Sequence, residues 1–245
     1  MDDRATRLAS LAAHGANVQE GQIVLVNAEL GHEELARAVA EAAYERGAKF
    51  VDVNYFDPHV KRARIAHADP ATLEYVPPWY GDRVRQHADG HGARINLNGV
   101  TAPNLLDDLD KTLVGRDRLP RLNEQGEIVA ERSTNWCIVP APTRPWAALV
   151  FPGLPEDESY ERLWQQIEHV LRLDEPDPGA AWDERMAVLN ESADRLAKQR
   201  FDAIELRGPG TELTIGLFST ATWWAADFTT AQGLRHLPNL PTEEV

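Results

Sequence analysis

Residues 23–55 read IVLVNAELGHEELARAVAEAAYERGAKFVDVNY, and this stretch decides the fold class. It opens with an apolar run at 23–26 and closes with a second one at 50–55, both typical of strands in a sheet. Between them, apolar residues recur at helical spacing, which predicts a helix over 32–46 that Gly47 closes. The helical face carries Leu35, Val39 and Ala42. Strand, helix and strand in this order indicate a βαβ unit with parallel strands and a right-handed crossover.

The chain on either side of this unit continues in the same style. The strands expected from apolar runs lie at 93–97, 136–139 and 146–151. The helices expected from periodicity lie at 8–12, 57–66, 77–89, 157–171 and 182–199, with shorter helical pieces between 105 and 130 that break near Pro120 and Gly126. The fold class is therefore α/β, with a mostly parallel sheet flanked by helices and an N-terminal domain over residues 1–200.

The pattern changes after residue 200. Residues 203–207 and 212–217 alternate between apolar and polar side chains, and the turn sequence Gly208-Pro209-Gly210 separates them. Alternation of this kind predicts antiparallel strands with one wet face. Residues 201–245 are therefore expected to be the first strands of a β-rich domain that this chain does not complete.

Composition excludes several classes of protein. The formal net charge is −14 and the sequence pI is about 5.0, with the acidic residues spread along all 245 positions. Such a balance opposes binding to nucleic acid, because phosphate contacts need clustered Lys and Arg. The N-terminus lacks the apolar centre of a signal peptide, and the chain has no run of about 18 apolar residues. No membrane partner is expected, and the predicted location is the cytoplasm.

Three familiar site motifs are absent or incomplete. The loop at 27–31 has one glycine, so it lacks the G-x-G-x-x-G of dinucleotide folds, and no P-loop occurs anywhere. The segment at 32–36 begins like the zinc motif H-E-x-x-H, but its last position is Ala36. His87 and His91 are four residues apart, yet Gly90 between them predicts the end of a helix, so the favoured interpretation is two solvated histidines.

Cys137 is the only cysteine, which rules out an intrachain disulfide and a cysteine-rich metal site. A catalytic thiol is one interpretation. The favoured one is a small apolar residue in a buried strand, because free cysteine is among the most buried residue types.

Short segments distributed along the chain also carry a family resemblance. In order they are NW-x-IVP at 135–140, WA at 146–147 with VFPGLP at 150–155, RLW at 162–164, AAW at 180–182, RF at 200–201, GPGT-x-LTIGL at 208–217 and PNLPTEEV at 238–245. Taken together with their spacing, these segments resemble the M29 family of metallo-aminopeptidases, of the thermophilic aminopeptidase T type. The first 130 residues match that family in pattern more than in motif.

The resemblance implies a function and a metal site. Proteins of that family have an N-terminal α/β domain and a C-terminal metallopeptidase domain that holds two divalent metal ions, Zn or Co, and they hydrolyse single residues from peptide N-termini. Their first metal ligand is a glutamate of the P-T-E-E segment. By resemblance this is Glu244, with Glu243 as the less favoured choice. The other ligands (a Glu, two His and an Asp) and a catalytic Tyr are expected beyond Val245.

These implications lead to several expectations. The chain is expected to be the N-terminal part of such an enzyme, and these 245 residues alone are expected to bind metal weakly and to hydrolyse nothing. Residues 203–230 are expected to form a homodimer or to stay disordered. The first alternative is a non-catalytic α/β binding or interaction module that retains only the first domain. The second is a doubly wound small-molecule-binding domain, which would need a pocket at the carboxyl ends of the first strands.

Overall fold

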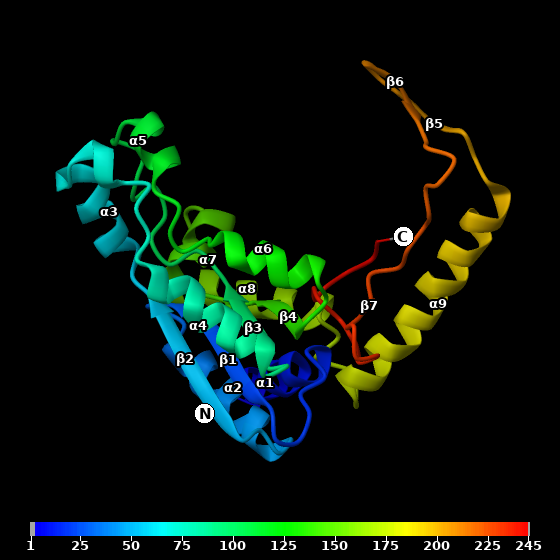
Figure 1. The fold of residues 1–245 in the computed structure, drawn as a ribbon, viewed down its shortest axis with the longest axis horizontal. Helices are drawn as coiled ribbons and strands as arrows, with labels where there is room; N and C mark the ends of the chain where they lie inside the picture. Colours follow the sequence, from blue (N-terminus) through cyan, green and yellow to red (C-terminus); the bar gives the residue numbers. More distant parts are fainter. Residues whose placement is uncertain (1–2, 245) are drawn as a thin grey trace.

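A computed structural model describes residues 3–244. Its centre is a four-stranded sheet in the order β2-β1-β3-β4, with all neighbouring strands parallel (Figure 1). The strands are β1 (Ile23–Glu29), β2 (Phe50–Phe56), β3 (Ala93–Asn98) and β4 (Asn135–Pro140). The first two follow the predicted apolar runs, with helix α2 (Glu33–Glu45) between them. The βαβ unit and the α/β fold class are therefore confirmed.

The two faces of the sheet differ in chemistry. Val24, Val26 and Ala28 of β1 are buried in the main apolar core, on the face where α1 (Asp3–Gly15) and α2 pack. The opposite face is more polar, and α4 (Pro78–Asp89) lies over it, where Arg83 bonds Asp52 of β2. Figure 1 shows α6 (Asn123–Ala130) beside α4 on this face. Alternate side chains of one strand thus serve two layers, as the pleat requires.

The other predicted helices are also present, most with small shifts of their ends. They are α3 (Pro58–His67), α8 (Glu156–Val170) and α9 (Pro178–Gln199), and α5 (Lys111–Arg116) is one of the expected short pieces. A short 3-10 helix spans Pro70–Thr72. Gly126, expected to break the chain, lies inside α6, where a side chain at its position would meet only open space.

The strand predicted at 146–151 is wrong. Residues Arg144–Val150 form helix α7 instead. The Thr143 hydroxyl accepts a hydrogen bond from the Trp146 backbone N–H at 3.1 Å, which caps the helix, and Pro145 lies in its first turn. A Thr cap followed by proline is a helix-start signal that outweighs the apolar composition of six residues.

The antiparallel hairpin predicted after residue 200 is present. It consists of β5 (Ala203–Gly208) and β6 (Thr211–Gly216), and Figure 1 shows it extending from the end of α9 away from the parallel sheet. Leu206 pairs directly with Leu213 and both side chains are exposed. The division into domains at residue 200 and the pairing of 203–230 with a second copy remain predictions.

The chain then returns to the parallel sheet. Two short strands, β7 (Phe228–Thr229) and β8 (Arg235–His236), pair antiparallel, and residues 237–242 follow them along the outer side of β4. We name residues 237–242 the C-terminal strap. No helix in the described part of the chain is long and apolar enough to cross a membrane.

Candidate functional site

The C-terminal strap is bonded to the edge of the sheet. The Ile138 backbone N–H donates to the Pro238 carbonyl at 2.7 Å, and the Leu240 N–H donates to the Ile138 carbonyl at 3.0 Å. The Leu237 N–H also reaches the Gly15 carbonyl at the end of α1, at 2.7 Å. These bonds fix the strap in parallel register beside β4, so the acidic residues that follow it start from a defined position.

Gly15 makes this seating possible. A Cβ atom at Gly15 would lie 2.7 Å from the Cys137 sulfur and 2.9 Å from the Leu240 Cδ1 atom. Real Cβ atoms do not approach other atoms so closely, so only glycine lets the end of α1, β4 and the strap meet here. The end of α1, β4 and the strap therefore pack directly against one another in the main core.

The two glutamates after the strap have different surroundings. The Glu243 carboxylate pairs with two arginines: the Arg185 Nε atom donates to it at 2.6 Å, and the Arg172 Nη2 atom lies 3.5 Å away. Glu244 is exposed, and within residues 3–244 no hydrogen bond or ion pair joins its side chain. Of the two, Glu244 therefore has its carboxylate oxygens available for a metal ion, whereas those of Glu243 accept from guanidinium groups.

The described residues do not by themselves fit a dinuclear metal centre. Within residues 3–244 no three His, Cys, Asp or Glu side chains come together in a way that could hold a metal ion. A divalent ion needs about four ligands in fixed geometry, so one free carboxylate at Glu244 does not constitute a site.

The histidines singled out in the sequence have structural surroundings. His32 is buried at the N-terminus of α2, and Ala36 is buried one turn later, so the described residues contain no zinc pair there. His87 is buried, not solvated as expected, and its Nε2 atom donates to the carbonyls of Ala93 and Ile23 at 3.0 and 3.2 Å. Burial lowers the pKa of His87. His91 is exposed beyond the helix end, as predicted.

Cys137 lies in β4 and is fully buried, in agreement with the favoured interpretation. Burial raises the pKa of its thiol far above the ordinary value, which removes the thiolate that nucleophilic chemistry requires.

We expect iodoacetamide to leave Cys137 unmodified in the folded protein at pH 8 and to label it fully in guanidinium chloride. Intact mass before and after treatment measures this, and rapid labelling of folded protein would restore the catalytic-thiol interpretation.

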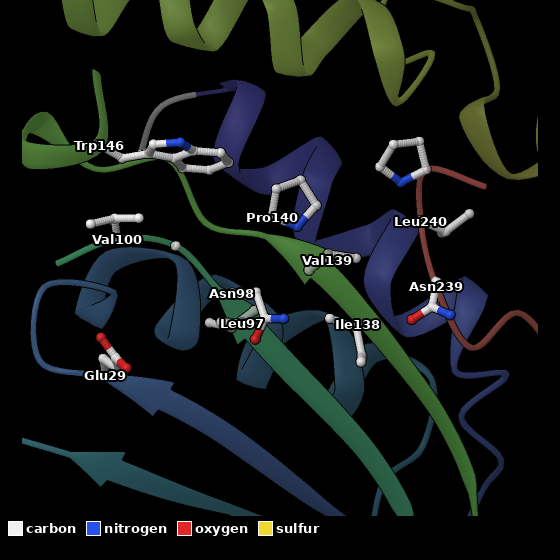
Figure 2. Close-up of a pocket in the computed structure, with 12 residues that line it drawn as sticks. Glu29, Leu97, Asn98, Val100, Ile138, Val139, Pro140, Trp146, Asn239 and Leu240 are labelled. Atoms are coloured by element: carbon white, nitrogen blue, oxygen red, sulfur yellow. The ribbon is translucent and has the colours of Figure 1, made fainter. Parts of the chain in front are cut away.

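A cleft of about 540 Å³ opens at the carboxyl ends of β1, β3 and β4 (Figure 2). Glu29 ends β1, Asn98 ends β3, Trp146 comes from α7, and Asn239 comes from the strap. The chain leaves β1 and β3 in opposite directions, since β1 leads to β2 on one side of this pair and β3 leads to β4 on the other. Such a switch point is where open α/β sheets bind ligands.

The family segments at 135–140, 146–147 and 238–245 contribute part of the cleft lining, but the sequence did not predict that they meet in a cleft, and Glu29 and Asn98 were not singled out. Sequence reasoning stated only that a small-molecule site would need a pocket at these strand ends, and a cleft is present there. A usable signal was the polar residue that ends each of two strands, Glu29 and Asn98. The strap contributes to the cleft because Asn239 pairs with Ile138 of β4, about 100 residues earlier in the chain. Local sequence patterns carry no signal for a contact between residues so far apart.

The chain is similar to known proteins over its whole length. The family model described as thermophilic metalloprotease (M29) matches residues 1–245. Aminopeptidase T of Thermus aquaticus is 37% identical over 99% of this chain, and aminopeptidase T of Thermus thermophilus is 38% identical over 98% of it. Aminopeptidase AmpS of Bacillus subtilis is 31% identical over 94%.

A solved structure, wild-type AmpT from Thermus thermophilus, superimposes with a TM-score of 0.88 at 34% identity, covering 98% of this chain and 60% of that one. The chain likewise spans 60% and 59% of the lengths of the two Thermus aminopeptidases. The resemblance drawn from the sequence segments is confirmed: the chain belongs to the M29 family of thermophilic metalloproteases.

Proposed function

We propose that this chain forms the N-terminal part of an aminopeptidase that hydrolyses single residues from peptide N-termini. The observation that carries the proposal is the family match over residues 1–245, joined by relatives that are named aminopeptidases. In this proposal residues 1–200 form the α/β domain and residues 201–245 begin the metallopeptidase domain. The partner is a peptide with a free N-terminus, and the location is the cytoplasm.

In this proposal Glu244 is the first ligand of a site for two divalent ions, Zn or Co. Its exposure and the engagement of Glu243 by Arg172 and Arg185 support that assignment. The remaining ligands come from outside the described residues, since residues 3–244 supply no ligand cluster. We therefore assign these residues the tasks of placing Glu244 and shaping the adjacent cleft.

The test compares matched glutamine substitutions in the full product of the natural gene. With Zn²⁺ or Co²⁺ present, Glu244→Gln is expected to lower kcat/KM for leucine p-nitroanilide by more than about 100-fold, because a metal ligand is lost. Glu243→Gln removes only partly exposed ion pairs and is expected to cost less than about tenfold. Purified residues 1–245 are expected to be inactive. Equal effects of the two substitutions, or turnover by residues 1–245, would contradict the proposal.

One observation favours a second candidate, a binding module without catalysis. The cleft at the switch point is lined by twelve described residues, whereas residues 3–244 contain no cluster of metal ligands. This candidate gains if the natural gene product has no peptidase activity while the cleft binds a ligand.

A further inference from the structure

The cleft is chemically polarised along its length. Figure 2 shows Glu29 on one side, Asn239 and Leu240 of the strap on the opposite side, and the ends of β3 and β4 between them. The side chains between are mostly apolar, as Leu97, Val100, Ile138, Pro140 and Trp146. A ligand lying across the cleft would therefore meet apolar walls first and a carboxylate at the far end.

Within the described part of the chain, the Glu29 carboxylate has no cationic partner. Its Oε2 atom accepts a hydrogen bond from the Thr101 hydroxyl at 2.6 Å. Among residues 3–244, no Lys, Arg or His side chain forms an ion pair with it. An ionised carboxylate can accept about four hydrogen bonds, so one bond leaves most of its capacity free. Its half-buried position makes it a stronger site for a cation than a fully solvated carboxylate.

The position of Glu29 is fixed on both sides. Its backbone N–H donates to the Nδ1 atom of His32 at 3.2 Å, and its carbonyl accepts from the His32 N–H at 3.0 Å. Gly31 closes this turn with φ +109°, and a Cβ there would also press against Thr101 at 3.2 Å. His32 holds the backbone of Glu29 and Thr101 holds its carboxylate. Little conformational entropy of this side chain is therefore lost when a ligand binds.

His32 does not neutralise Glu29. The ring is only 3% exposed, and burial lowers the pKa of His32 despite the opposing effect of the Glu29 and Glu33 carboxylates, which favours the uncharged ring. Since Nδ1 accepts a hydrogen bond, the hydrogen of the neutral ring is on Nε2. Among residues 3–244, no cation therefore pairs with the carboxylate at this end of the cleft.

We propose that the cleft binds an aliphatic chain that ends in a cation, namely the side chain of lysine or arginine. The stem packs along the apolar wall of Leu97, Val100 and Trp146, and the ammonium or guanidinium group bonds Glu29. The volume of about 540 Å³ lies within the ordinary range for small-ligand sites. Phosphate-bearing ligands are disfavoured, because Glu29 repels them and the loop lacks a glycine-rich cradle.

The cleft is also close to the proposed metal ligand. Pro241 lines the cleft, and Glu244 is three residues further along, at most about 11 Å between Cα atoms for an extended chain. A peptide whose N-terminal residue is Lys or Arg could thus place its side chain in the cleft and its first peptide bond near Glu244. This assignment of the substrate class rests on the proposed function, whereas the binding itself does not.

The test measures binding without turnover. Isothermal titration of the 245-residue protein with L-lysinamide and with L-norleucinamide compares two ligands that share the α-amine and the stem but differ in the terminal charge. Lysinamide is expected to bind about 10- to 100-fold more tightly, the range for a charged hydrogen bond in a partly buried site. Glu29→Gln is expected to abolish this preference, while Glu34→Gln, an exposed carboxylate in the first turn of α2, leaves it unchanged.

Two outcomes overturn the inference. Equal affinity for the two ligands in the unmodified protein excludes a side-chain cation site, even if Glu29→Gln fails to fold. Retention of the lysinamide preference in folded Glu29→Gln protein, verified by thermal unfolding, places the cation elsewhere.

A kinetic comparison separates this inference from the proposed function. Hydrolysis of lysine and leucine p-nitroanilides by the full gene product tests both the aminopeptidase proposal and the preference of the cleft for a cationic side chain. Binding preference without hydrolysis refutes the aminopeptidase proposal and keeps the cleft assignment. Hydrolysis with no preference for lysine, together with no binding of lysinamide, refutes the cleft assignment and keeps the aminopeptidase proposal.

Discussion

Replacing Trp182 with alanine is expected to lower the free energy of unfolding by about 3–5 kcal/mol, the range for removing a large aromatic side chain from a core. Trp182 in α9 is 0% exposed, and its indole N–H donates to the Leu171 carbonyl at 2.9 Å. The substitution leaves a cavity and an unpaired buried carbonyl. Urea unfolding followed by far-UV circular dichroism measures the loss.

A matched control tests whether burial causes this effect. Trp79 in α4 is 60% exposed, so Trp79→Ala is expected to change the free energy of unfolding by less than about 0.5 kcal/mol. Trp182→Phe keeps most of the apolar volume but loses the indole hydrogen bond. Its loss in free energy of unfolding is therefore expected to lie between those of Trp79→Ala and Trp182→Ala. A loss below about 1 kcal/mol for Trp182→Ala would contradict the complete burial of this side chain.

Trp182 also connects the core to the acidic residues that follow the strap. The Arg172 guanidinium lies 5.2 Å from the Trp182 ring centroid, and the same group faces Glu243. Milder substitutions at Trp182 are therefore expected to disturb the surroundings of Glu243 before they unfold the protein.

Acidification from pH 6.5 to pH 4 is expected to remove roughly 3 kcal/mol of stability through His236 alone. His236 is 4% exposed and packs against the rings of Trp136 and Phe228, which also contact each other. Burial lowers the pKa of His236 from 6.5 to about 4. In this window the unfolded chain binds the proton and the folded chain does not, so stability is complete above pH 6.5 and falls as the pH approaches 4.

Urea unfolding at several pH values between 4 and 7 measures this dependence. His236→Phe, which keeps a buried ring without a titrating group, is expected to show a flatter profile than the unmodified protein. His59→Gln, at an exposed position in α3, is expected to keep the original slope. Burial also lowers the pKa of His32 and of His87, but these residues are common to all three proteins. Parallel profiles for His236→Phe and the unmodified protein would refute the assignment.

Local patterns predicted the part of the fold in which local signals agree. The stretch at 23–55 combines two apolar runs, one helical period and Gly47 at positive φ, and each feature matches the structure. The hairpin after residue 200 was predictable for a similar reason, since strict alternation flanks a Gly-Pro-Gly turn. In both stretches every local preference points to the same structure.

The prediction failed where two local signals conflict. Residues 146–151 are apolar enough for a buried strand, but Thr143 and Pro145 begin a helix there. Apolar runs of six residues do not distinguish a strand from a short helix, whereas a Thr cap followed by proline favours the helix. Gly126 shows the opposite error, because one glycine on the exposed side of a helix costs only about 1 kcal/mol.

The candidate site was predictable only in outline. The resemblance pointed to Glu244, and the small-molecule-binding alternative required a pocket at the carboxyl ends of the first strands. The proposed role of Glu29 depends on contacts that no local pattern encodes, since its carboxylate accepts a hydrogen bond from Thr101, 72 positions later in the chain. The opposite wall of the cleft comes from the strap, more than 200 residues from Glu29.

The seating of residues 238–240 beside β4 also has a consequence for solubility. An uncovered edge strand offers free N–H and C=O groups to any extended chain and so invites aggregation. Here the outer side of β4 is already occupied, and its new neighbour carries Pro238 and Pro241, which have no N–H to donate. The parallel sheet is therefore closed to foreign strands on this side, and the segment that places Glu244 also protects the fold from edge-to-edge association.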